Sequence, residues 1–159
     1  MRPEHDIVGA CIERARATPR RVVFPEGEDE RVVAAARALL DRAIALPIVL
    51  GKADAIAAAA ARAGVRCEGI DCRDPQDAER LAEYARLYSE GRDNAHAKLA
   101  QRAVRRPLFH AGMMLKSGDA DAMIAGASHP TGRVIEAGLM TVGLAAGIRT
   151  PSRFFLLLV

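Results

Sequence analysis

The sequence has no tryptophan, and aromatic residues make up only 4% of it. Side chains on which nucleobases could stack are therefore scarce. Lysine is rare as well, with only Lys52, Lys98 and Lys116, and the arginines are spread among acidic residues instead of being gathered in one stretch. A formal net charge of +3 distributed in this way argues against a nucleic-acid-binding face.

No apolar run approaches the roughly 20 residues that a membrane-spanning helix requires. The most strongly apolar run, FFLLLV at residues 154–159, is far shorter, and no charged and then apolar signal opens the chain. We therefore expect a soluble, cytoplasmic protein with no membrane partner. An apolar strand with nothing after it to cover it resembles the middle of a longer protein, so we expect residues 151–159 to enter a further domain.

Cysteine and metal-binding patterns are also sparse. Cys11, Cys67 and Cys72 are odd in number and form no CxxC pair, which favours free thiols over a disulfide or a metal site. The acidic residues Glu26 and 28–30 have no calcium-loop spacing, and carboxylates at the start of a helix ordinarily favour its dipole. We expect no bound metal.

Glycine-rich phosphate-binding motifs are missing too. The chain contains neither Gly-x-Gly-x-x-Gly nor Gly-x-x-x-x-Gly-Lys-Ser/Thr, the patterns in which backbone N–H groups hold nucleotide phosphates. This absence disfavours an unrelated nucleotide-binding α/β domain.

The chain alternates short apolar runs with longer amphipathic segments. The runs predict strands at residues 21–24, 45–50, 65–72, 122–125 and 153–159. The segments predict helices at residues 5–17, 28–43, 52–63, 74–90, 94–103, 107–117 and 132–144. This order predicts a three-layer α/β/α domain with a parallel sheet, covering residues 1–150.

Three residues give local signals about where these elements begin. Pro47 lacks a backbone donor, so we expect it near the start of its strand or at a sheet edge. Asp74 followed by Pro75 predicts a helix start at that point, with the aspartate as cap.

The candidate functional stretch is residues 119–131, a short strand that runs into a turn of small and hydroxyl residues. Ligands of open parallel sheets bind beyond the carboxyl ends of the strands, so we expect residues 128–133 to line a groove. Ser128 and Thr131 either donate to a phosphate or carbonyl oxygen or only cap the next helix. Both roles stay open for Ser128, and capping is expected for Thr131.

Charged residues flank this turn on both sides. His129 has no carboxylate partner in its own stretch, so we expect a cleft-wall residue and not an acid or base. Arg133 opposes the helix dipole, which fits a nearby anion or, as we expect, a solvent-facing position. Asp119 and Asp121 share a face at the strand entrance, opposite the functional end, and are expected to be structural.

Three stretches together resemble the phosphate acetyl/butyryltransferase family. VFPEGEDERV at residues 23–32 is similar to its strand-turn-helix opening, and LPIVLG at 46–51 to its second strand. GMM at 112–114, followed by DADAMIAGASHPT at 119–131, is similar to its mid-chain signature. They occur in the family's order and span essentially the whole chain.

The resemblance implies an acyltransferase that moves an acetyl or similar short acyl group between acetyl-CoA and phosphate, giving acetyl phosphate. It implies a fold related to isocitrate and isopropylmalate dehydrogenases, with the active site between two α/β domains, usually in a dimer. Coenzyme A would be a substrate, with no permanently bound cofactor. Family chains are about twice as long, so we expect this amino-terminal half to be inactive alone, with every catalytic residue in the missing half.

The resemblance also implies substrate contacts, and here the sequence departs from the family pattern. Ser128, His129, Thr131, Arg133 and Arg86 are the candidates for binding the substrate or coenzyme A. The arginine expected near Arg86 is one position out of register, with leucine in its place, and glutamate stands five residues after the turn where relatives often carry arginine. The alternative is a non-catalytic regulatory or assembly domain of the type fused to malic enzymes.

Overall fold

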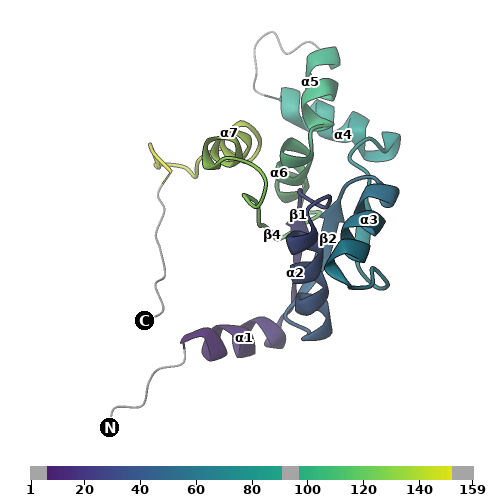
Figure 1. Ribbon diagram of the computed structural model, residues 1–159. Coiled ribbons are helices and arrows are strands. Elements are labelled where there is room, and N and C mark those ends of the chain that lie inside the picture. The colour runs from purple at the N-terminus through teal and green to yellow at the C-terminus, as the bar shows by residue number, and fades with distance from the viewer. Residues whose placement is uncertain (1–6, 91–96, 152–159) are drawn as a thin grey trace.

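The computed structural model describes residues 7–90 and 97–151. Its strands are β1 (Arg20–Phe24), β2 (Ala45–Leu50), β3 (Asp71–Arg73) and β4 (Ala122–Met123). Its helices are α1 (Ile7–Ala17), α2 (Glu30–Asp41), α3 (Ala53–Ala63), α4 (Ala78–Ser89), α5 (Ala97–Val104), α6 (Pro107–Ser117) and α7 (Thr131–Thr141). Figure 1 shows their arrangement.

The four strands form a parallel sheet in the order β3-β2-β1-β4. Val22 lies opposite Pro47 of β2 on one side of β1 and opposite Ala122 of β4 on the other. The chain therefore builds outward from β1 to β2 and β3, and then returns to place β4 on the free side of β1. The order of the strands reverses between β1 and β4, which makes this pair a topological switch point.

One face of the sheet is covered by α2 and α3. Val22 and Phe24 of β1 and Val49 of β2 point to this side and form one core with Val33 of α2 and Ile56 of α3. Side chains alternate along a strand, so the residues between them must face the opposite way. Apolar residues on both sides of β1 and β2 explain why these strands lack polar alternation.

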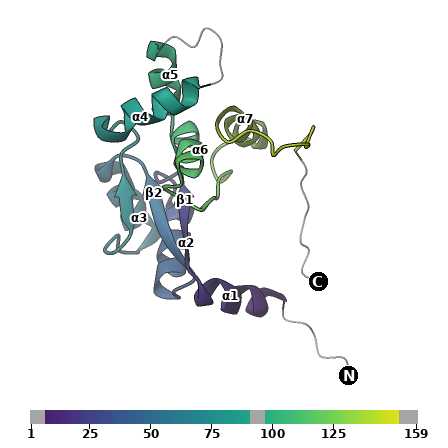
Figure 2. The same ribbon diagram turned by 180° about the vertical axis from the view of Figure 1, so that it is seen from behind.

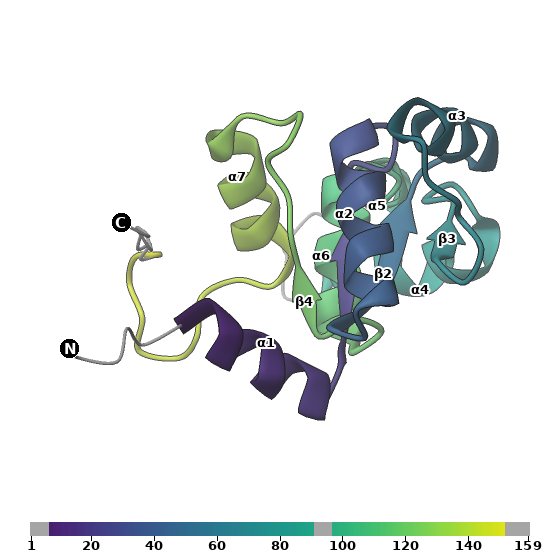
Figure 3. The ribbon, with the colours of Figure 1, turned by 60° about the horizontal axis from the view of Figure 1, so that its bottom comes forward.

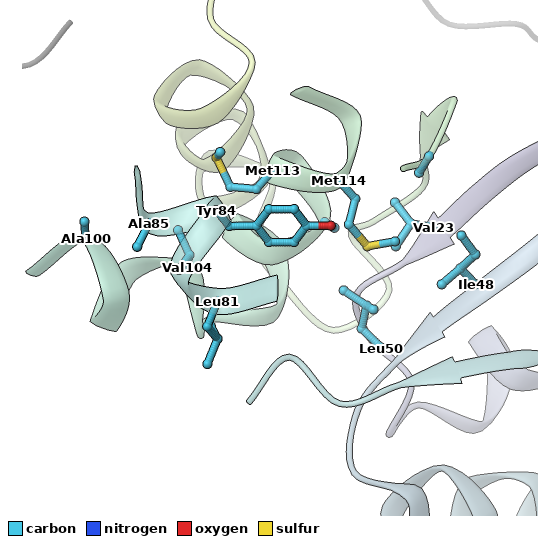
Figure 4. Packing of buried hydrophobic residues seen from close by; sticks show 12 residues of the cluster. Val23, Ile48, Leu50, Leu81, Tyr84, Ala85, Ala100, Val104, Met113 and Met114 are labelled. Carbon is cyan, nitrogen blue, oxygen red and sulfur yellow. The ribbon is translucent and has the colours of Figure 1, made fainter. Parts of the chain in front are cut away.

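The other face is covered by α4 and α6, with α5 packed against both. Val23, Ile48 and Leu50 of the sheet meet Tyr84 of α4 and Met114 of α6 in a second core, all of them buried. Figure 4 shows the Tyr84 ring among these side chains. The predicted three-layer α/β/α parallel-sheet fold is confirmed.

Helices α1 and α7 extend away from these layers (Figures 2 and 3). No residue of α1 is buried, and its contact with the body includes a hydrogen bond from Arg16 Nε to the Arg42 carbonyl at 2.9 Å. Helix α7 packs on α6, where Ala137 meets Leu108 and Phe109. The amphipathic pattern thus predicts α1 as a helix, although its apolar residues are exposed or only half-buried in the described part of the chain.

Two predicted elements begin several residues later than expected. The strand expected at residues 65–72 is only the three residues of β3, because Ile70 N–H donates to the Cys67 carbonyl and closes a turn there. The helix expected from Asp74 begins at Ala78, because the Asp74 side chain accepts from the Gln76 N–H and its carbonyl from the Asp77 N–H, which makes a separate turn. A capping signal marked the right region but not the first helical residue.

Other expectations were closer. Pro47 is buried in β2 but precedes Ile48, where pairing with β3 starts, so its missing donor faces no strand on that side. Gly64 and Gly118 end α3 and α6 in the left-handed conformation, with φ of 66° and 80°. The strand at 122–125 is shorter than expected, and the strand at 153–159 lies outside the described residues. No helix in the described part is long and apolar enough to span a bilayer.

Candidate functional site at the carboxyl edge of the sheet

The loops that follow β1 and β4 meet beyond the carboxyl ends of these two neighbouring strands. Residues 25–27 leave β1 and residues 124–129 leave β4, at the point where the strand order reverses. Open α/β sheets bind their ligands in this position, because the flanking connections diverge and leave a crevice. The topology therefore selects this pair of loops as the candidate site.

Glu26 holds the second loop from within the first. Its Oε2 accepts hydrogen bonds from the backbone N–H groups of Gly126 and Ala127, both at 2.8 Å. Its Oε1 accepts from the backbone N–H groups of Ser128 and His129 at 2.9 and 2.7 Å, and His129 Nδ1 lies 2.7 Å from the same oxygen. Five contacts saturate the roughly four lone-pair positions of a carboxylate.

This carboxylate is buried, with a side chain only 1% exposed. Burial alone would raise the pKa of Glu26, but the hydrogen bonds from His129 and from the N–H groups of the loop outweigh it and lower the pKa from 4.5 to about 2. A shift of this size corresponds to about 3 kcal/mol of preference for the ionised form. Glu26 is therefore an anion at neutral pH, and the four consecutive N–H groups form an anion-binding nest that the protein fills itself.

His129 is oriented by this carboxylate. Because ionised Glu26 can only accept, Nδ1 must carry the proton that it donates, and in the neutral ring Nε2 is then the acceptor. The side chain is 39% exposed, and His129 is one of the residues that line the neighbouring cavity. His129 has no carboxylate partner in its own stretch, as the sequence indicated, but Glu26 supplies one from 103 residues away in the chain.

A cavity of about 200 Å³ opens between these loops and the end of β2. Its lining residues are Pro25, Glu26, Gly27, Glu28, Leu50, Gly51, Pro107, Ser128 and His129. Gly27 N–H donates to the Leu50 carbonyl at 3.1 Å, and a Cβ on Gly27 would come within 2.5 Å of that oxygen and of Val49 Cγ1. Only glycine allows this close approach of the two backbones.

The arginine that interacts with the buried carboxylate of the cavity lies outside the cavity lining. None of the lining residues is lysine or arginine, and Glu28 adds an exposed second acidic group. Arg31 lies outside, where it binds Asp29 at 2.7 Å and donates to the Ala127 carbonyl at 2.6 Å, which supports the loop from behind. Over the described ranges, no group of three His, Cys, Asp or Glu side chains is placed to hold a metal ion.

The structure brings only some of the candidate residues to this cavity. Ser128 and His129 line it, whereas Thr131 and Arg133 follow on α7 and do not. Arg133 is exposed and paired with Glu136 at 3.0 Å. Arg86 lies in a different hollow between α4 and α5, where it pairs with Glu90.

Neither Ser128 nor Thr131 caps helix α7. The N-cap of α7 is Pro130, which has no side-chain hydrogen bond, and Thr131 is already the first helical residue. The expectation that Thr131 caps this helix is therefore wrong. The N–H of Ser128 is taken by Glu26, and its exposed hydroxyl has no hydrogen bond to another described residue.

Sequence reasoning missed Glu26 as the organising residue. The signal in the sequence is an acidic residue inside the Pro-Glu-Gly turn, directly after a buried strand. The same residue also fits a carboxylate that interacts favourably with the dipole of the next helix, which is the role predicted for it. Asp119 and Asp121 have structural roles, as expected. Asp119 accepts from Tyr84 at 2.7 Å, and Asp121 pairs with Arg21 at 2.9 Å.

The fold and the position of the site define an α/β protein with a ligand crevice at the switch point of a parallel sheet. Comparison with known families is more specific. The family described as phosphate acetyl/butaryl transferase matches residues 6–159, so the chain belongs to this family. The prediction made from the three sequence stretches is confirmed.

Individual relatives agree with this assignment. The chain is 36% identical over 153 residues to a phosphate acetyltransferase of Treponema pallidum, covering 94% of the chain and 46% of the relative. It is 31% identical over 150 residues to one of Acetivibrio thermocellus, covering 93% and 45%. The chain thus spans less than half the length of these curated relatives.

Solved structures show the same relationship. A phosphotransacetylase from Streptococcus pyogenes superposes with a TM-score of 0.84 at 27% identity, covering 90% of this chain and 44% of that one. The EutD phosphotransacetylase from Staphylococcus aureus gives 0.82 at 26% identity, covering 91% and 44%. In both cases the match covers less than half of the solved chain.

Proposed function

We propose that this chain is the first domain of a phosphate acyltransferase, which exchanges a short acyl group between coenzyme A and inorganic phosphate. The observation that carries the proposal is the family match over residues 6–159. Residues 1–150 would form the domain and residues 151–159 the entry into a second one. The family also favours a cytoplasmic homo-oligomer with acyl-CoA and phosphate as substrates and no resident cofactor.

In this reaction a phosphate oxygen attacks the thioester carbonyl, and coenzyme A leaves as the thiolate. This domain would supply one wall of the active site, through the cavity at the carboxyl edge, and the remaining part of the protein would supply the groups that act on the carbonyl and the phosphate. This chain would then contribute to catalysis by positioning the substrates. Correct positioning of two reactants can raise a reaction rate by many orders of magnitude.

A non-catalytic role in regulation or assembly is the second candidate. It is favoured by the positions and pairing partners of the residues that the family resemblance implies for binding coenzyme A. Arg86 pairs with Glu90 away from the cavity, Leu87 stands where an arginine was expected, and Glu136 pairs with Arg133. A domain that kept the fold while losing its anion contacts would have these features.

The first prediction concerns activity. We expect the 159-residue chain alone to release no thiol from acetyl-, propionyl- or butyryl-CoA in a phosphate-dependent manner, because half of a cleft cannot orient both reactants. The product of the complete reading frame should be active in the same thiol-release assay, with the Acetivibrio thermocellus enzyme as positive control.

Phosphate-dependent turnover by the purified 159-residue chain would contradict the proposal that residues outside this chain are required for activity. An inactive but well-folded product of the complete reading frame would instead favour the regulatory or assembly role.

A further inference from the structure

Another cavity, of about 290 Å³, lies where the end of β3 and the turn after it meet helices α4 and α6. It shares no lining residue with the cavity at the carboxyl edge of the sheet. Its volume is at the small end for ligand pockets, which suits a small molecule. Tyr84 of α4 and His110 of α6 belong to its lining, and only 1% and 4% of these residues are exposed. The cavity therefore reaches two polar side chains that are otherwise buried.

His110 has an unused hydrogen-bond acceptor. Its Nδ1 lies 3.2 Å from the Val104 carbonyl oxygen, which can only accept, so Nδ1 carries the proton and Nε2 has the lone pair. Burial lowers the pKa of this imidazole, and the hydrogen bond to Val104 does not reverse the shift, so the ring is neutral at neutral pH.

The lone pair of Nε2 is open to a ligand. Nε2 has no hydrogen bond to another described residue. In the described part of the chain, the one fully enclosed side-chain nitrogen or oxygen without a partner is Nε of Arg37. Nε2 of His110 is therefore not sealed in the core, and the cavity is the opening that His110 lines.

The rest of the lining carries opposite charges in equal number. Arg73 and Arg80 contribute the cations, and Asp74 and Asp77 contribute the carboxylates. Cys72 adds no charge, because partial burial raises the pKa of its thiol. A ligand with a net charge would meet repulsion from one pair as well as attraction to the other. The lining therefore matches a molecule without net charge that has one positive and one negative end.

The two arginines keep N–H groups that can bind the negative end. Nε and Nη2 of Arg73 donate to Asp71 at 2.7–3.1 Å, and Nη1 of Arg80 donates to Glu83 at 2.9 Å. Nη1 of Arg73 and Nε of Arg80 have no hydrogen bond within residues 7–90 and 97–151. Arginine N–H groups form strong, charge-assisted hydrogen bonds with a carboxylate.

The positive end has acceptors of its own. Oδ1 of Asp74 accepts from the Gln76 N–H at 2.8 Å, whereas Oδ2 accepts from no other described residue. Together with Nε2 of His110, this oxygen can accept from an ammonium group. A metal ion does not fit instead, because no group of three His, Cys, Asp or Glu side chains in the described ranges is placed to hold one.

We propose that this cavity binds a small α-amino acid as its zwitterion, with the ammonium on His110 and Asp74 and the carboxylate on Arg73 and Arg80. An α-amino acid carries both charged groups on one carbon and has no net charge when its side chain is neutral, as in alanine or serine. The site goes beyond the proposed function and does not depend on it, because the acyl-transfer reaction uses no amino acid.

NMR titrations of the 159-residue chain with L-alanine, L-lactate and ethylamine test the ligand class. L-Lactate keeps the carboxylate but has a hydroxyl in place of the ammonium, and ethylamine keeps the ammonium without the carboxylate. We expect saturable binding of L-alanine that is at least about tenfold tighter than that of either analogue, because each analogue loses charge-assisted hydrogen bonds. Equal affinity for the three probes, or no binding of L-alanine up to its solubility limit, would overturn the proposal.

The location of the site is tested by variants. H110F keeps a ring but removes the acceptor, and should weaken L-alanine binding about two- to tenfold, the value of one neutral hydrogen bond. R80Q removes a cation whose side chain is 50% exposed, and should weaken binding about tenfold or more. R102Q is the matched control, because Arg102 is an exposed arginine of α5 outside this cavity, and it should leave binding unchanged.

The imidazole itself provides a readout that does not require a variant to fold. In long-range ¹⁵N spectra of the wild-type chain, L-alanine should shift the Nε2 signal of His110 while Nδ1 stays protonated. R102Q should show the same shift, and R80Q should require about tenfold more L-alanine to reach it. An Nε2 signal that ignores L-alanine, or unaltered binding in R80Q, would refute the assignment.

Discussion

Replacing Glu26 by glutamine is expected to lower the free energy of unfolding by about 3 kcal/mol, because the new amide must direct its NH₂ at backbone N–H donors. The carboxylate oxygens each accept at least two of these donors, and a carboxamide has only one oxygen. At least two N–H groups therefore lose their partner. Urea denaturation at neutral pH measures the change.

The loss of stability caused by E26Q should become smaller as the pH falls. The pKa of Glu26 is lowered from 4.5 in the unfolded chain to about 2 in the folded one, so its stabilisation is fully present above about pH 4.5 and is lost as the pH falls toward 2. The gap in stability between the wild type and E26Q should therefore narrow across that window. E28Q is the matched control and should change stability by less than about 0.5 kcal/mol at neutral pH. A gap that stays constant down to pH 2 would contradict the assigned pKa.

Substituting Gly112 by alanine should undock α7 from α6. A Cβ at this position would lie only 2.8 Å from Thr141 Cβ and even closer to Thr141 Oγ1. Thr141 is buried, and its hydroxyl donates to the Ala137 carbonyl at 2.6 Å, so it has little freedom to move aside. Overpacking of this kind costs about 1–3 kcal/mol, more than the gain of up to about 1 kcal/mol from replacing a helical glycine. Thermal unfolding measures the net loss.

Gly138 provides the control for that substitution. It lies in α7 itself, and a Cβ there would meet nothing within 4 Å. G138A should therefore be neutral or stabilising by up to about 1 kcal/mol through helix propensity alone. Equal stability changes in G112A and G138A would show that the two helices do not pack as described.

The fold could be predicted from the sequence where local pattern decides it. Unbroken apolar runs in β1 and β2 reflect burial on both faces, and Gly64 and Gly118 end helices because they adopt positive φ. The short strand β3 was harder, because its three residues are exposed or only half-buried and carry little apolar signal. Capping by Thr131 failed because Pro130 already holds the extended conformation that the N-cap needs.

The site could be located but not assembled from the sequence. The strand-end rule predicted that the turn after β4 lines a groove, and Ser128 and His129 do line a cavity there. Its organiser could not be identified, because Glu26 is separated from its partners by 100 to 103 residues and no local spacing joins them. His129 therefore looks isolated in the sequence, although the Glu26 carboxylate orients it in the structure.

Glu26 organises the loop at the switch point of the sheet. Amide hydrogen exchange of residues 126–129 tests this role most directly, because residues 126–128 are exposed and would exchange rapidly unless their N–H groups are bonded. We predict that all four amides exchange slowly in the wild type and that E26Q accelerates at least two of them, while the amides between β1 and β2 keep their rates. Rapid exchange of these four amides in the wild-type chain would contradict the account.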